Sequence, residues 1–90
     1  MRYHVEFTTS AGREIRKLRK SIQPKLMKNI SERINALAED PRPPGVEKVE
    51  GHDLWRVRAG DYRIVYSVEE DVLTVVVVKI GHRREVYREL

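Results

Sequence analysis

Apolar and polar residues alternate along residues 54–66 with a period of two, and the alternation is interrupted once, at Gly60-Asp61. A period of two is typical of a β-strand that buries one face. Glycine tolerates the positive φ that the first central residue of a two-residue hairpin turn adopts. The pattern therefore predicts a β-hairpin that turns at Gly60-Asp61, with Ala59 opposite Tyr62 and Trp55 opposite Tyr66.

The two faces of this predicted hairpin differ in chemistry. The apolar face is assigned to the core and carries Trp55, Val57, Ala59, Tyr62, Ile64 and Tyr66. The other face carries Arg56, Arg58 and Arg63, and the register places Arg58 directly opposite Arg63. Opposed like charges destabilise a strand pair, whereas guanidinium groups bind phosphate in a bidentate manner. We interpret this face as an anion-binding surface; an ordinary solvent-exposed strand face is the alternative.

The first half of the chain predicts one strand and two helices. Alternation at residues 3–7 predicts the strand, and helical spacing predicts a helix over residues 10–20. A second helix is expected to begin at Pro24, which suits a first helical turn, and to end near Ala38, before Asp40-Pro41. The two helices should form an antiparallel hairpin.

The second half of the chain adds strands. A short strand is expected at residues 46–49, and an apolar central strand at residues 72–80 that Gly81 ends. We therefore predict an α+β fold, with the helical hairpin packed on one face of a mostly antiparallel sheet of about four strands. A short C-terminal segment should follow. The arginine face of this sheet is also partly apolar, so we expect a partner to cover it.

Composition limits the class of protein. The chain has 90 residues, so we expect one domain that spans residues 1–90. It contains no cysteine, which fits a reducing compartment, and no apolar run long enough to cross a membrane. The first residues lack the apolar block of a secretory signal. We expect a soluble, cytoplasmic protein without a membrane partner.

Basic charge is concentrated near the N-terminus. Residues 10–20 contain five basic residues and one acidic residue, a local excess equal to the net charge of the whole chain, +4. The basic residues are Arg13, Arg16, Lys17, Arg19 and Lys20. Clustered positive charge favours a polyanionic partner, although a solvated helix face is the commoner origin of such a cluster.

Most kinds of catalytic chemistry have no motif in this sequence. His4, His52 and His82 lie on separate segments without metal-ligand spacing, and neither a Gly-rich phosphate loop nor a nucleophile motif occurs. We therefore expect no metal and no cofactor. What remains is metal-free phosphate chemistry, in which RNA supplies its own 2′-hydroxyl and the protein supplies charge stabilisation, a proton acceptor and a proton donor.

Three segments resemble the RelE branch of the RelE/ParE toxin superfamily. They read LWRVRAGDYRIVY at residues 54–66, GHRREVY at residues 81–87 and EDPRPPG at residues 39–45. The resemblance covers essentially the whole chain. It implies the toxin of a type II toxin-antitoxin pair, which enters the ribosomal A site and cuts mRNA there, leaving a 2′,3′-cyclic phosphate and a 5′-hydroxyl.

The resemblance also implies a set of catalytic residues. Carried over to this sequence, they are Arg56, Arg58, Arg63, Arg83 and Tyr87. The best-studied members carry lysines where Arg56 and Arg58 stand, and arginine is a poor general base because its pKa lies above about 12. We therefore take His82 as a substitute base, with Glu85 and Tyr87 as nearby alternatives.

The resemblance further implies several partners. A cognate antitoxin should wrap the toxin, and DNA should be contacted only indirectly, through the antitoxin complex. The basic cluster of residues 10–20, together with Arg84, should contact the rRNA backbone of the ribosome while the site holds mRNA. Two other functions stay open: a ParE-like inhibitor that binds DNA gyrase, and a non-catalytic RNA-binding module.

Overall fold

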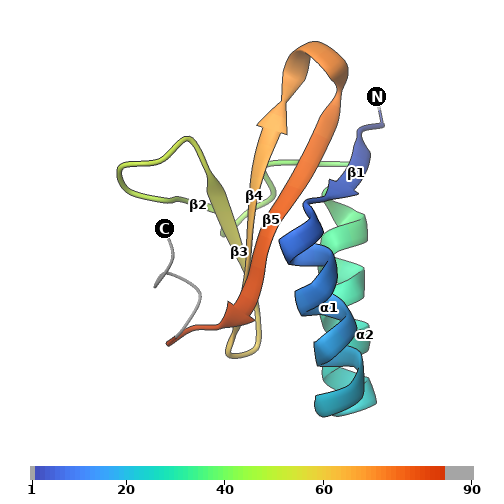
Figure 1. Cartoon of the computed structure of the whole chain (residues 1–90). Helices are drawn as coiled ribbons and strands as arrows, with labels where there is room; N and C mark the ends of the chain where they lie inside the picture. Colours follow the sequence, from blue (N-terminus) through green and yellow to red (C-terminus); the bar gives the residue numbers. More distant parts are fainter. Residues whose placement is uncertain (1, 85–90) are drawn as a thin grey trace.

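A computed structural model of the chain describes residues 2–84 (Figure 1). Its helices and strands, in chain order, are β1 (His4–Phe7), α1 (Thr9–Ser21), α2 (Pro24–Ala36), β2 (Glu47–Lys48), β3 (Trp55–Ala59), β4 (Tyr62–Glu69), the 3₁₀ turn η1 (Glu70–Val72) and β5 (Thr74–His82). The strands form one sheet in the order β1-β5-β4-β3-β2. β1 runs parallel to β5, and every other pair is antiparallel. The predicted α+β architecture is confirmed, with five strands instead of about four because the short β2 joins β3.

Both helices lie on one face of the sheet (Figure 1). Thr8 caps α1, since its hydroxyl accepts a hydrogen bond from the Ala11 N–H at 3.1 Å. Pro24 opens α2, where its missing N–H costs no helical hydrogen bond. Neither α1 nor α2, the helices of the described residues 2–84, has the length and apolar character to span a membrane.

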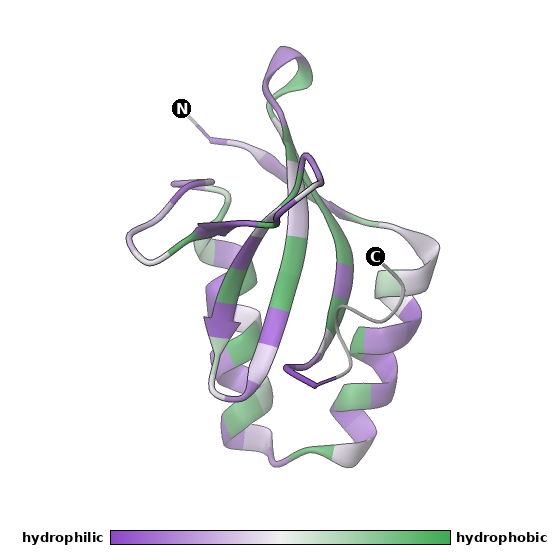
Figure 2. Cartoon of the chain, turned by 90° about the vertical axis from the view of Figure 1, so that its left-hand side faces the viewer, coloured by the Kyte–Doolittle hydropathy of each residue, from purple (hydrophilic) through white to green (hydrophobic). Residues whose placement is uncertain are grey.

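The hairpin of β3 and β4 has the predicted register. Trp55 pairs with Tyr66, Arg58 with Arg63 and Ala59 with Tyr62, which leaves a two-residue turn. Gly60 has a φ of 61°, a backbone conformation that a side chain would strain. Figure 2 views the sheet from the side away from the helices, and hydrophilic and hydrophobic residues alternate along β3.

β5 extends beyond the predicted end at Gly81. Gly81 pairs with Arg63, and the strand ends one residue later, where His82 pairs with Tyr62 at the start of β4. A glycine lacks a side chain but keeps both backbone hydrogen-bonding groups, so the length of the neighbouring strand sets the end of β5. At the other end, η1 and Leu73, with a φ of 46°, delay the start of β5 to Thr74.

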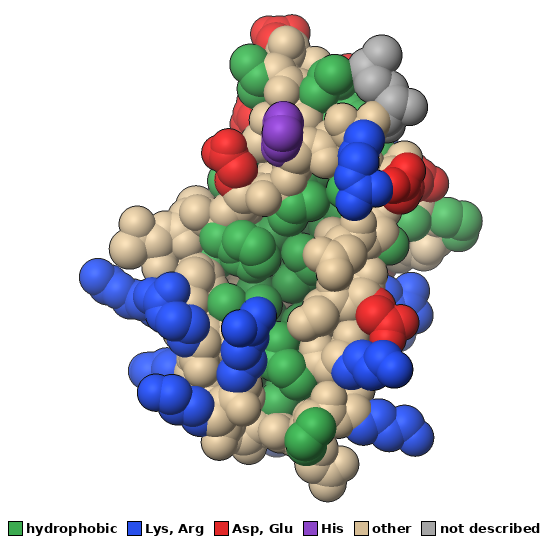
Figure 3. Space-filling model, turned by 90° about the vertical axis from the view of Figure 1, so that its right-hand side faces the viewer, with side chains coloured by type: hydrophobic (Ala, Val, Ile, Leu, Met, Phe, Trp, Pro, Cys, Tyr) green, Lys and Arg blue, Asp and Glu red, His purple; other side chains and the backbone are tan. Residues whose placement is uncertain are grey.

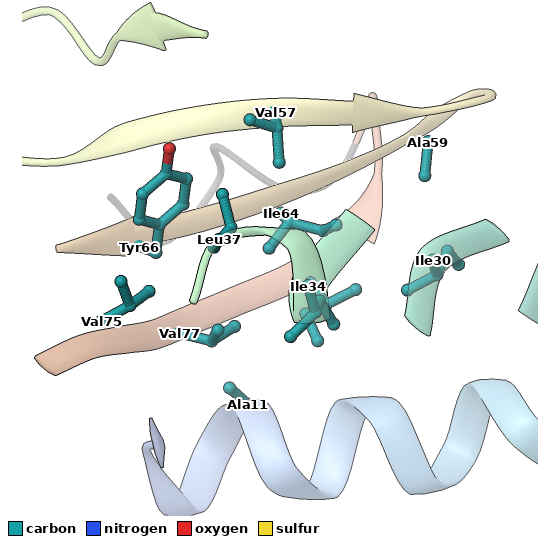
Figure 4. Close-up of a cluster of buried hydrophobic side chains, with 11 residues drawn as sticks. Ala11, Ile30, Ile34, Leu37, Val57, Ala59, Ile64, Tyr66, Val75 and Val77 are labelled. Atoms are coloured by element: carbon teal, nitrogen blue, oxygen red, sulfur yellow. The ribbon is translucent and has the colours of Figure 1, made fainter. Parts of the chain in front are cut away.

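The core lies between the sheet and the two helices (Figure 4). Its buried members are Ala11, Ile30, Ile34, Leu37, Val57, Ala59, Ile64, Tyr66, Val75, Val77 and Ile80. Tyr66 is the largest of these side chains, and its hydroxyl donates to the Pro41 carbonyl at 2.6 Å. Burial raises the pKa of the Tyr66 phenol, which therefore remains a hydrogen-bond donor. This bond fixes the connector between α2 and β2 to the core.

Trp55 packs against this core but remains half-buried, although the sequence pattern assigned it to the interior. Two cations lie over its ring: the Arg42 guanidinium at 5.2 Å and the Lys48 ammonium at 4.7 Å from the ring centroid. Both come from the connector and β2. Cation–π contacts with these side chains cover the ring where the helices do not.

The sheet face opposite the helices has a small cluster of its own. Val49 and Val65 are buried there, and Leu54 and Val78 pack against them. The loop between β2 and β3 thus covers part of the apolar surface that the sequence suggested a partner would cover. A bulge at Val65 and Tyr66 interrupts the register between β4 and β5 in this region.

The edge of β5 is covered by two different elements. β1 pairs with β5 only as far as Val77. Beyond that point, the Glu14 carboxylate of α1 accepts hydrogen bonds from the Ile80 N–H at 3.0 Å and from the Lys79 ammonium at 2.9 Å. A side chain thus takes the place of the missing strand residue.

We predict that Tyr66→Phe lowers the free energy of unfolding by about 1–2 kcal/mol, because the variant leaves the Pro41 carbonyl without its donor. Urea denaturation measures this change. Tyr62→Phe is the matched control, since the Tyr62 hydroxyl has no hydrogen-bond partner among the described residues and its loss should change stability by less than about 0.5 kcal/mol. Equal losses in both variants would contradict a specific role for the Tyr66 hydrogen bond.

Candidate functional site

Five arginines and one glutamate line an open depression on the sheet face away from the helices, which we call the arginine cleft. Its residues are Glu47, Arg56, Arg58, Arg63, Arg83 and Arg84, and its volume is about 390 Å³. Strand parity explains this grouping, because Arg56, Arg58 and Arg63 all lie opposite the core-facing positions of β3 and β4. Arg83 joins them because its N–H donates to the Asp61 carbonyl at 2.8 Å, which holds the end of β5 beside the hairpin turn.

The structure thus brings together four of the residues predicted as catalytic: Arg56, Arg58, Arg63 and Arg83. Arg84, which the sequence assigned to rRNA contact, lies with them. Lysine would offer a single ammonium at each position, whereas the guanidinium groups present planar forks of donors that match phosphate oxygens.

The cleft is not neutralised by ion pairs within the described chain. Arg58 is exposed and makes no hydrogen bond or ion pair with any described residue. Among the described residues, Arg63 donates only to backbone carbonyls, those of Gly60 at 3.4 Å and Tyr62 at 3.3 Å. The Arg83 Nε lies 3.9 Å from an exposed Asp61 carboxylate, a separation at which solvent screens much of the attraction. The cleft therefore keeps a strong positive potential.

Glu47 is the residue of this site that the sequence patterns did not identify. It lies opposite Arg56 in the register of β2 and β3, and its Oε2 is 3.3 Å from the Arg56 Nη2. The hydrogen bond and charge of Arg56 lower the pKa of the Glu47 carboxyl, and Arg58 and Arg63 act in the same direction. The cleft therefore contains an ionised carboxylate at neutral pH.

His82 does not lie in the arginine cleft. It pairs with Tyr62 across β4 and β5, and the two rings meet edge to face with centroids 5.7 Å apart. Directly opposed residues share a face, so His82 points with Tyr62 toward the helix side of the sheet. There it lines a separate pocket of about 270 Å³ with Glu14 and Lys17 of α1. This placement removes His82 as a base for a phosphate bound among the arginines.

Tyr87, the remaining residue of the predicted catalytic set, lies outside the described residues, as does Glu85. The roles suggested for them stay predictions.

The basic cluster of α1 forms a second positive surface. Arg13, Arg16, Lys17, Arg19 and Lys20 are all exposed and share one shallow depression. They lie on the helix layer, whereas the arginine cleft lies on the opposite face of the sheet. Figure 3 shows this helix side, where Lys and Arg side chains flank a central apolar stripe. The two positive surfaces can therefore contact different parts of a large polyanion.

Comparisons with known proteins identify the family. A protein family described as ParE toxin of type II toxin-antitoxin system, parDE, matches residues 5–87. The chain is 31% identical over 90 residues to Toxin RelG of Mycobacterium tuberculosis, covering 98% of this chain and 99% of that protein. It is 33% identical over 94 residues to the mRNA interferase toxin RelE of Escherichia coli strain K12, covering 99% and 94% of the two proteins.

A solved structure shows the same relationship in three dimensions. The archaeal RelE-RelB complex from Pyrococcus horikoshii contains a chain that superposes with a TM-score of 0.76 at 27% identity, covering 96% of this chain and 100% of that chain. Sequence and fold agree along nearly the full length, so the chain belongs to the RelE/ParE superfamily and is a toxin of a type II toxin-antitoxin system.

Proposed function

We propose that the protein is an endoribonuclease that cleaves mRNA in the ribosomal A site. The observation that carries this proposal is the arginine cleft, in which five arginines from β3, β4 and the residues just after β5 line one depression together with a carboxylate. Further support comes from the similarity to the RelE relative that is named an mRNA interferase. A surface of this kind suits a phosphodiester whose negative charge grows during reaction.

The proposed reaction is an intramolecular transesterification. The 2′-oxygen of one ribose attacks the adjacent phosphorus, the bond from phosphorus to the 5′-oxygen of the next nucleotide breaks, and a 2′,3′-cyclic phosphate and a 5′-hydroxyl result. Arg58 and Arg63 would hold the non-bridging oxygens, where their charges stabilise the transition state. Arg56 and Arg83, on either side, would orient the RNA backbone.

Glu47 takes the role of proton acceptor in this proposal, in place of His82. It is ionised at neutral pH, so it can accept the proton of the 2′-hydroxyl without prior deprotonation. The arginines that lower its pKa also weaken it as a base. A bound phosphate offsets their charge, so the pKa of Glu47 should rise once substrate is present. The leaving 5′-oxygen would take its proton from solvent, and Tyr87 remains a predicted member of the catalytic set.

The partners follow from the two positive surfaces. The arginine cleft would hold mRNA, and the α1 basic cluster would contact the rRNA backbone, which positions the protein without reading sequence. A cognate antitoxin is the third partner, by analogy with the RelE-RelB complex of P. horikoshii. The antitoxin would inhibit the toxin by covering the arginine cleft. The toxin would contact DNA only through the complex with the antitoxin.

A second candidate function is inhibition of DNA gyrase. The matching family is described as ParE toxin, and a ParE-like toxin of this type needs no catalytic residues. Gyrase-dependent DNA breaks in the presence of the toxin, without cleavage of mRNA, would support this alternative.

We predict that Arg58→Ala combined with Arg63→Ala lowers the rate of A-site cleavage at least about 10²- to 10³-fold, because both charges that face the reacting phosphate are lost. Toe-printing of mRNA on programmed ribosomes measures the cut. Arg2→Ala is the matched control, since Arg2 precedes β1 and pairs with Glu39, away from the cleft. Full cleavage by the double variant would remove the arginine cleft from the mechanism.

We predict that Glu47→Gln lowers the cleavage rate about 10²- to 10⁴-fold and leaves RNA binding unchanged or tighter, because the variant loses a proton acceptor and one negative charge. The cleavage rate of the parent protein should fall as the pH drops through the pKa of Glu47, where the carboxylate becomes protonated. The residual cleavage rate of the variant should not show this decrease at low pH.

Glu50→Gln serves as control, since Glu50 is exposed and does not line the cleft. If the cleavage rate of Glu47→Gln decreased at low pH as that of the parent protein does, the proton acceptor would be another group.

A further inference from the structure

A second hollow adjoins the arginine cleft, and we call it the proline pocket. It is lined by Arg33, Ala36, Leu37, Pro43, Pro44, Gly45, Val57 and Arg58, and its volume is about 190 Å³. Its walls come from the C-terminal end of α2, the connector before β2, and β3. Arg58 lines both hollows, so the proline pocket opens beside the side chain that is free to bind phosphate.

The backbone of Arg58 is unpaired on the side of the pocket. The Val49 N–H donates to the Leu54 carbonyl at 2.9 Å, so the even-numbered residues of this strand direct their backbone groups toward β2. β2 pairs only with Trp55 and Arg56. The N–H and carbonyl of Arg58 therefore face the open edge of β3 without a partner among the described residues.

The walls of the proline pocket are held in place by contacts outside it. The Tyr66 hydroxyl fixes Pro41, and Arg42 pairs with Glu70 at 2.6 Å, so the start of the connector is held at two points. The Val46 N–H donates to the Pro43 carbonyl at 3.1 Å, and Gly45 has a φ of 87° in the turn that this bond closes. The pocket therefore exists before any ligand enters, which lowers the entropic cost of binding.

We propose that the proline pocket binds an unpaired nucleobase of the RNA whose phosphate is held in the arginine cleft. This inference rests on the proposed function. The proline rings and Val57 offer apolar surfaces to a planar ring, while Arg33 and the Arg58 backbone offer hydrogen-bonding groups to its edge. Proteins that recognise single-stranded RNA combine these two kinds of contact on a splayed base. The nucleotide would bend around Arg58, with its phosphate on the side chain and its base at the strand edge.

The dimensions favour a base over a peptide strand. The pocket is smaller than the roughly 300–1,000 Å³ typical of sites for drug-sized ligands, so it suits one ring system. An added β-strand needs a row of open backbone groups, and the edge of β3 offers those of Arg58 before the hairpin turn begins at Gly60. A base needs only one donor and one acceptor.

The test uses the full chain and a short single-stranded RNA that carries 2′-O-methyl groups, which prevent cleavage. Ala36→Leu places a larger side chain in the pocket without altering any arginine, and Ala36 is exposed, so the core is undisturbed. Asn35→Leu, at the neighbouring exposed position outside the pocket, is the matched control. Thermal unfolding checks that both variants fold.

We expect Ala36→Leu to raise the dissociation constant about tenfold at low salt and Asn35→Leu to leave it unchanged. Removing one base from the RNA, at one position only, should weaken binding to the parent protein by the same factor. That abasic RNA should bind Ala36→Leu as it binds the parent, because the variant and the missing base delete the same contact.

A measurement without variants gives a second test. Free nucleosides, which carry no phosphate, should shift the amide NMR signals of Ala36, Gly45 and Val57 in the parent protein.

RNA binding that is equal in Ala36→Leu and the parent but weakened by Arg58→Ala would contradict base binding in the proline pocket and would still support phosphate binding in the arginine cleft. Absence of RNA binding by the parent would overturn both, and weakened binding of an antitoxin peptide alone would assign the pocket to a peptide.

Discussion

The two-residue turn at Gly60-Asp61 is the constraint on which the rest of this structure depends. It sets the parity of β3 and β4, and parity decides which side chains meet the helices and which meet the solvent. Arg58 and Arg63 lie opposite each other across the hairpin, so their repulsion destabilises the strand pair locally. The same arrangement concentrates positive charge on one face of the sheet. One residue added to the turn without a compensating bulge would reverse the parity of β4 relative to β3, placing Arg63 on the core side and Ile64 on the cleft side.

Much of the fold and part of the site could be predicted because their determinants are local in sequence. The hairpin, its register and its arginine face follow from a period of two around a single glycine-containing turn. The helices follow from their apolar spacing and from Pro24. The grouping of Arg56, Arg58 and Arg63 is therefore visible in the sequence, and the family resemblance added Arg83.

The remaining features depend on contacts between distant segments. Glu47 enters the site through a strand of only two residues, too short for a periodic pattern, so its register opposite Arg56 has no sequence signal. His82 was expected near the arginines because it precedes Arg83, but β5 continues through Gly81 and neighbouring strand residues point to opposite faces. Trp55 is half-buried because Arg42 and Lys48, brought in by the connector and β2, cover its ring.

The contact of Glu14 with β5 has a consequence for the behaviour of the free chain. The last residues of β5 would otherwise present a bare hydrogen-bonding edge, which invites pairing with the same edge of another molecule. The Glu14 carboxylate occupies the Ile80 N–H, so this group is not open to a carbonyl of an approaching strand. One acidic side chain within a strongly basic helix thereby covers part of a sheet edge that could otherwise pair with another molecule.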